Sequence, residues 1–99
     1  MALFAITFRI HADSTYESRY ESVVAAIKTA TTSTYWAEPT SFFLIEYGGT
    51  SSALTTAIDG ASTFAESKDI LLAINLSAKA YSVIGKSTDA DLKKLMDAR

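Results

Sequence analysis

The opening run, Met1 to Ile10, alternates heavy apolar side chains with smaller or polar ones, and this alternation constrains the fold more than any other feature. In an extended chain, side chains two residues apart point to the same side. The heavy positions on one side are Phe4, Ile6, Phe8 and Ile10. We therefore predict a half-buried strand. The run is short and no basic residue precedes it, so we do not expect a secretory signal.

A helix is predicted directly after this strand. Ser14 and Glu17 have the spacing of a capping box, which satisfies free amides at a helix start. The apolar residues that follow recur at helical spacing: Tyr16, Tyr20, Val23, Val24 and Ile27. The charged residues assigned to the opposite, solvent-facing side are Glu17, Arg19, Glu21 and Lys28. We expect the helix to end near residue 30.

The remaining elements follow from turn residues and apolar runs. They are a strand-like Tyr35–Trp36, a turn at Pro39, a strand over Ser41–Tyr47, a helix capped by Thr50 or Ser51 that runs to about Ile58, a strand over Ile70–Leu76, a short strand over Tyr81–Ile84, and a helical turn or two after Thr88. Residues 61–69 fit either another helical turn or a surface loop.

This order predicts the α+β class: a ferredoxin-like βαββαβ sandwich with an additional short C-terminal strand and a C-terminal helical turn. The 99 residues suit a single domain, residues 1–99. Two helices can cover only one face of the sheet. If Phe4, Phe42 and Leu72 point toward the helices, then Leu3, Phe43 and Leu71 point away from them. An apolar second face would be exposed in a monomer, so we expect a homodimer that covers it.

Composition narrows the chemistry. The chain has no cysteine and one histidine, which excludes disulfides, thiolate metal sites and a multi-histidine metal site within one chain. Its net charge of -2 and pI near 5.2 do not favour nucleic acid as a partner. No apolar stretch is long enough to span a membrane. We expect a cytoplasmic protein with no cofactor and with a protein partner.

The end of the first strand carries the one cluster of polar groups of catalytic type: Arg9, His11 and Asp13. Strand ends are common places for functional sites. The alternative, which we favour, is that Asp13 or Ser14 caps the helix while His11 is a solvated loop residue.

Three other features have structural explanations that we prefer to functional ones. Tyr35–Trp36 has the rings to stack on a base, but aromatic pairs beside hairpins more often lie in a core or interface. Glu38 and Glu46 are expected to be surface charges. The stretch Gly48–Ser52 lacks the spacing and the lysine of a phosphate-binding loop.

Several segments resemble the CRISPR-associated Cas-two proteins and their SinR-like relatives. The matching segments are Phe8-Arg9-Ile10, which is similar to the family's strand-one Tyr-Asp-Ile signature, the tyrosine-rich Tyr16–Tyr20, Asp69–Leu76 and Ser82–Gly85. The resemblance covers most of the chain and implies a ferredoxin-like protein that forms dimers through its sheets. In nuclease-type members, the strand-one acid binds a divalent metal ion. Arg9 stands in that position here, and a guanidinium cannot ligate a cation.

The resemblance and this departure lead to one preferred function and two alternatives. We expect a non-catalytic homodimeric interaction protein that binds a macromolecular partner. The first alternative is a divalent-metal-dependent nuclease in which Asp13 replaces the missing acid; only this alternative needs a metal. The second is a cofactor-free small-molecule oxygenase or isomerase with a pocket lined by Trp36 and His11. Exchange of the fifth strand between subunits stays an open question.

Overall fold

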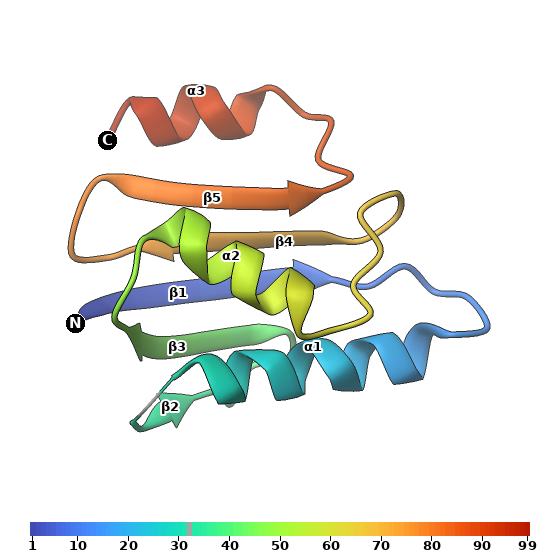
Figure 1. Cartoon of the computed structure of the whole chain (residues 1–99). Helices are drawn as coiled ribbons and strands as arrows, with labels where there is room; N and C mark the ends of the chain where they lie inside the picture. The colour runs from blue at the N-terminus through green and yellow to red at the C-terminus, as the bar shows by residue number, and fades with distance from the viewer. Residues whose placement is uncertain (32) are drawn as a thin grey trace.

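The structure, a computed structural model, describes residues 1–31 and 33–99 and has an α+β fold in which helices pack on an antiparallel sheet (Figure 1). The strands are β1 (Ala2–Arg9), β2 (Tyr35–Trp36), β3 (Phe42–Tyr47), β4 (Ile70–Asn75) and β5 (Ala80–Gly85). The helices are α1 (Tyr16–Ala30), α2 (Ser51–Gly60) and α3 (Asp91–Asp97). The strand order is β2-β3-β1-β4-β5, so β1 lies at the centre. The prediction of the α+β class is confirmed.

Local sequence explains where the helices begin. The Thr50 side chain accepts a hydrogen bond from the Ala53 N–H at 3.0 Å, which confirms Thr50 as the cap of α2. The predicted capping box at Ser14 is wrong: α1 begins at Tyr16 without a side-chain cap. Asp13, not Ser14, makes the side-chain contact before this helix: its carboxylate accepts a hydrogen bond from the Thr15 N–H at 3.0 Å and closes a turn there.

The segment of residues 61–69 contains no helix and crosses between α2 and β4 as a loop. Phe64 anchors it, because this ring is buried in the core cluster. A turn at its end is closed by the Asp69 N–H, which donates to the Ala65 carbonyl at 2.8 Å. Of the two descriptions that the sequence left open, the loop is therefore the observed one.

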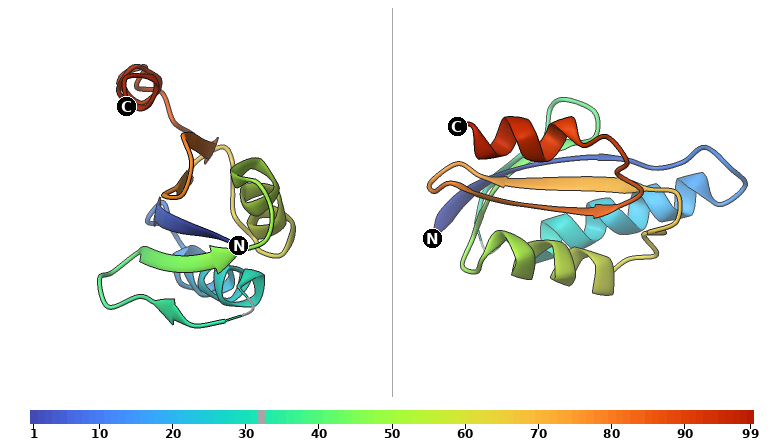
Figure 2. Two further views of the ribbon diagram at one scale, coloured as in Figure 1. Left: turned by 90° about the vertical axis from the view of Figure 1, so that its left-hand side faces the viewer. Right: turned by 90° about the horizontal axis from the view of Figure 1, so that it is seen from above.

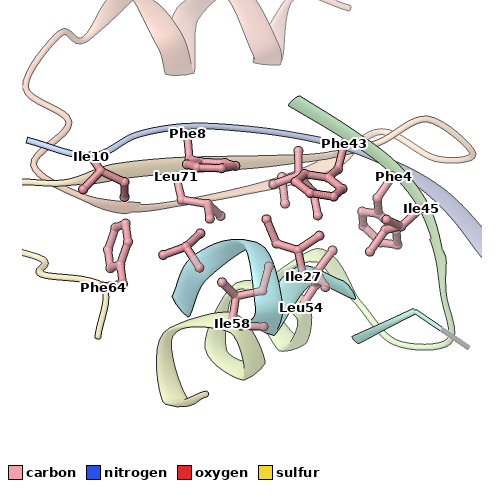
Figure 3. Packing of buried hydrophobic residues seen from close by; sticks show 14 residues of the cluster. Phe4, Phe8, Ile10, Ile27, Phe43, Ile45, Leu54, Ile58, Phe64 and Leu71 are labelled. Atoms are coloured by element: carbon pink, nitrogen blue, oxygen red, sulfur yellow. The ribbon is translucent and has the colours of Figure 1, made fainter. Parts of the chain in front are cut away.

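Helices α1 and α2 cover one face of the sheet, and the core lies between them and the strands (Figures 1 and 3). The heavy side of β1 points into this core, as its alternation predicted. Strand pairing then fixes the neighbours, since directly opposed residues share a face. Ile6 opposes Phe43 and Phe8 opposes Leu71, and all four side chains are buried.

This register corrects the expected orientation of β3 and β4. Phe43 and Leu71 point toward the helices, whereas Phe42 and Leu72 point to the other face, where both oppose Thr7 of β1. The expected set was shifted by one residue, and a one-residue shift exchanges the two faces of a strand. Leu3 does lie on the face away from the helices, as expected, and is partly exposed.

Helix α3 lies beyond the β5 edge, on the side away from α1 and α2 (Figure 2). None of its residues is buried, and the Leu95 side chain is 70% exposed. Its apolar residues Leu92, Leu95 and Met96 follow the spacing of one helical face. Among the described residues, no helix has both the length and the apolar character that a membrane crossing requires.

Candidate functional site

The structure separates the three polar residues that the sequence places at the end of β1. Arg9 is exposed on the sheet face away from the helices, because its neighbour Phe8 points into the core. The His11 side chain is exposed, and its backbone N–H donates to Asp69 at 2.8 Å. Asp13 lies at the start of α1, where Arg19 and Lys68 surround it. The geometry brings Asp13 and the His11 backbone, but not Arg9, to one cluster.

The centre of that cluster is a buried ion pair between Arg19 and Asp69. The guanidinium donates from Nε and Nη2 to the two Asp69 oxygens at 3.1 and 3.2 Å. The backbone N–H groups of His11 and Ala65 donate to the same carboxylate at 2.8 and 2.9 Å. Arg19 Nη1 also donates to Asp13 at 2.7 Å, and Lys68 donates to the other Asp13 oxygen at 2.6 Å. We call these residues, Asp13, Arg19, Lys68 and Asp69, the charged junction.

Hydrogen bonds and charge keep both carboxylates of the charged junction ionised. Burial opposes ionisation of Asp69, but hydrogen bonds from Arg19 and from two backbone N–H groups outweigh it, so its pKa lies below the usual value. Arg19 and then Lys68 lower the pKa of Asp13. Among the described residues, no buried side-chain nitrogen or oxygen lacks a hydrogen-bond partner. The charged junction thus joins β1, α1 and the loop before β4 as a satisfied structural contact.

The prediction that Arg19 lies on the solvent-facing side of the helix is wrong, because this residue is buried. It is only 5% exposed. The spacing contained the signal: Arg19 follows Tyr16 by three residues and precedes Val23 by four, which places it on the same helical stripe. An arginine on an apolar stripe requires an acidic partner, and Asp69 supplies it.

The sheet face away from α1 and α2 has a largely apolar surface. We call it the open sheet face and define it by its larger outward-pointing apolar residues: Leu3, Trp36, Phe42, Leu44, Ile70, Leu72, Ile74 and Val83. Trp36 is 45% exposed and its ring contacts Phe42 edge-on, with centroids 6.2 Å apart. Near Arg9 this face has a groove of about 300 Å³, where Leu72 and Val83 meet Leu92 of α3.

A second hollow, of about 530 Å³, lies between α1 and the segment of β2 and the β2–β3 loop. Its lining includes Tyr20 and Lys28 from α1, Tyr35 and Trp36 from β2, and Glu38 from the loop. Trp36 is thus part of a pocket between helix and sheet, as one alternative expects, but His11 does not line it. We call this hollow the aromatic cavity.

Metal ligands are sparse in the part of the chain that the structure describes, where no three His, Cys, Asp or Glu side chains form a group suited to an ion. The carboxylate oxygens of Asp13 are of the type that binds a divalent cation. Both of its oxygens, however, already accept hydrogen bonds from cationic side chains. A metal ion there would have to displace Arg19 and Lys68.

Neither the models of known protein families, nor the curated proteins, nor the solved structures contain a match to this chain.

Proposed function

We propose that this chain is a non-catalytic interaction protein of the ferredoxin-like kind, similar to the Cas-two and SinR-like proteins, which forms a homodimer and binds a macromolecular partner. The observation that carries the proposal is the open sheet face. Its apolar side chains come from all five strands, and neither α1 nor α2 covers them. Apolar patches that extend over several strands are typical of interaction surfaces. The strand order β2-β3-β1-β4-β5 supports the ferredoxin-like assignment.

The size of the open sheet face suits a second copy of the chain. The five strands together hold 28 residues, which at about 3.3 Å per residue and about 4.8 Å between strands give a projected area of about 440 Å². Two such faces contribute about 890 Å², a little below the roughly 1,000 Å² that a specific interface needs. The apolar side of α3, which stands at the edge of this face, would add to that area.

Charge favours one arrangement of the two copies. Arg9 lies at one end of β1 on the open sheet face, and Glu46 opposes Leu3 near the other end. A two-fold axis in the interface and perpendicular to the strands reverses the strand direction, so Arg9 of one copy lies over Glu46 of the other. An axis parallel to the strands would instead bring the two Arg9 side chains together, which costs energy. We infer the perpendicular axis.

Light scattering coupled to size exclusion tests the proposal. The wild-type chain should have twice its mass of 10.7 kDa at micromolar concentration. Leu72→Lys should be a folded monomer, whereas Thr56→Lys, a matched change on the exposed side of α2, should remain a dimer. A wild-type monomer, or a Leu72→Lys dimer, would contradict the proposal.

A charge exchange tests the axis. Arg9→Glu should weaken the dimer about tenfold or more, because it places acidic groups opposite Glu46. The double variant Arg9→Glu/Glu46→Arg should recover most of the wild-type affinity in analytical ultracentrifugation. If both variants dimerise equally well, the inferred axis is wrong while the dimer itself stands.

The two alternatives have weaker support. The nuclease requires a free acid, and the nearest one to Arg9 along the chain, Asp13, is held by Arg19 and Lys68. Incubation with RNA and duplex DNA in magnesium or manganese decides it, with Asp13→Ala as the control. The oxygenase or isomerase has a cavity with Trp36 but without His11, which leaves it without the expected proton-transfer group.

A further inference from the structure

The aromatic cavity is walled by a continuous row of rings. The Tyr20 ring contacts Phe8, with centroids 5.4 Å apart, and Phe8 stacks on Phe43 at 6.5 Å. Phe43 in turn contacts Tyr35 at 5.9 Å. Of these rings, Tyr20, Tyr35 and Phe43 line the cavity. A planar ring that enters the cavity would therefore meet aromatic surface contributed by α1, β2 and β3.

The wall is held in place by contacts from several elements. Ser41 carries a φ of +58°, in the left-handed region that non-glycine residues seldom adopt. Its carbonyl accepts the Phe8 N–H at 3.2 Å, and its hydroxyl donates to the Tyr20 hydroxyl at 3.4 Å. These bonds tie the loop before β3 to β1 and α1. The cavity is thus formed in the unliganded chain, as small-molecule sites usually are.

Charge at the cavity is uneven. The Lys28 ammonium lies 5.4 Å from the centre of the Tyr35 ring, so a positive charge is fixed against the aromatic wall. Glu38 is the carboxylate that lines the cavity, from the β2–β3 loop. Of these two charges, the one placed against an aromatic ring of the wall is that of Lys28, so a ligand ring that lies on Tyr35 would have its charged group next to a cation.

We propose that the aromatic cavity binds a small aromatic carboxylate, with its ring against Tyr35 and Tyr20 and its carboxylate paired with Lys28. The volume of about 530 Å³ is within the range of small-molecule sites and exceeds what a single phenyl acid fills. The proposal is independent of the homodimer, because the cavity is formed by one copy of the chain.

Nuclear magnetic resonance can test the site with three probes that share a phenyl ring and differ in charge: phenylacetate, 2-phenylethanol and 2-phenylethylamine. The reporters are the backbone amides of Tyr35, Ala37 and Ser41, three residues that line the cavity. Phenylacetate at millimolar concentrations should shift these amide signals saturably. It should bind about two- to fivefold more tightly than the alcohol and more tightly still than the amine.

Two charge variants sharpen the test, because both change exposed side chains and should fold normally. Lys28→Gln should lower the phenylacetate affinity to that of the alcohol, and Glu38→Gln should raise it. Lys79→Gln, far from the cavity lining, is the matched control and should change nothing. Tyr35→Leu should weaken all three probes alike.

Three results would overturn the proposal. The first is the absence of any saturable shift with phenylacetate. The second is equal or tighter binding of 2-phenylethylamine, which would assign the controlling charge to Glu38. The third is a set of shifts centred on Thr7 and Leu92, which would locate the probe in the groove of the open sheet face.

Discussion

Removal of the Asp69 carboxylate should destabilise the chain more than any other single change in the charged junction. Asp69 is completely buried and accepts four hydrogen bonds, two from Arg19 and one each from the His11 and Ala65 backbones. Asp69→Ala leaves these donors without their acceptor. Breaking a buried ion pair by removal of one partner costs about 3–5 kcal/mol. A chain of 99 residues has a total stability of about 5–15 kcal/mol, so the loss is a large part of it.

Urea unfolding followed by far-ultraviolet circular dichroism measures this effect. The midpoint for Asp69→Ala should fall by at least about 1 M. Glu66→Ala, an exposed acid in the same loop, should stay within about 0.5 kcal/mol of the wild type. All proteins must be compared at one concentration, because dimerisation raises apparent stability.

If Asp69→Ala does not fold, Asp69→Asn provides the measurement, since it keeps the shape and one acceptor oxygen while it removes the charge and replaces the other oxygen by an NH2 group. A loss below about 1 kcal/mol for Asp69→Ala would refute the reasoning. It would mean that water or a rearranged loop replaces the carboxylate at little cost.

Further predictions concern pH, a close backbone approach and a helix cap. Because the pKa values of Asp13 and Asp69 are lowered in the folded chain, their ionised carboxylates stabilise the fold fully above the unfolded pKa of about 4, and this stabilisation is lost at lower pH. The urea midpoint of the wild type should therefore fall as the pH is lowered from about 5 to about 2, and that of Asp13→Asn should fall less steeply. Gly85→Ala should cost about 2–5 kcal/mol in thermal unfolding, because its Cβ would lie 1.9 Å from the Asp69 carbonyl oxygen at a φ of +94°; Gly60→Ala, with nothing within 4 Å, should not destabilise. Thr50→Ala should cost about 1 kcal/mol by the same measurement, because α2 loses its cap. Each prediction has its own contradicting result: for Asp13→Asn, a pH dependence of the urea midpoint equal to that of the wild type; for Gly85→Ala or Thr50→Ala, a thermal stability equal to that of the wild type.

Strand faces could be predicted where the sequence alternates and not where it is uniformly apolar. In β1, Phe8 and Arg9 differ enough that the alternation assigns each to a face. In β3 the neighbours Phe42 and Phe43 are identical in type, so hydrophobicity cannot tell which one faces the helices. The answer depends on the register with β1, which is a long-range property. The same ambiguity explains the shifted assignment in β4.

The candidate site was harder to predict than the fold, for a similar reason. Arg9, His11 and Asp13 are close in sequence, yet strand alternation sends Arg9 to one face while the chain turns toward α1 at Asp13. The actual partner of that region, Asp69, is 50 residues from Arg19. Helical spacing contained a signal for the burial of Arg19, although the prediction assigned this residue to the solvent-facing side, and only the folded chain identifies the acid that it meets.

The charged junction also explains why the polar end of β1 is poorly suited to chemistry. A catalytic acid or base needs an atom that is free to bond to the substrate, or a pKa near the working pH. In the charged junction the carboxylate oxygens already have donors, and the pKa of Asp69 moves away from neutrality. The Asp69 carbonyl further accepts the Lys86 N–H at 2.8 Å, so the same residue fastens the end of β5. The polar groups of the charged junction are thus occupied by contacts within the chain, which is why the proposals of binding rest on the open sheet face and the aromatic cavity.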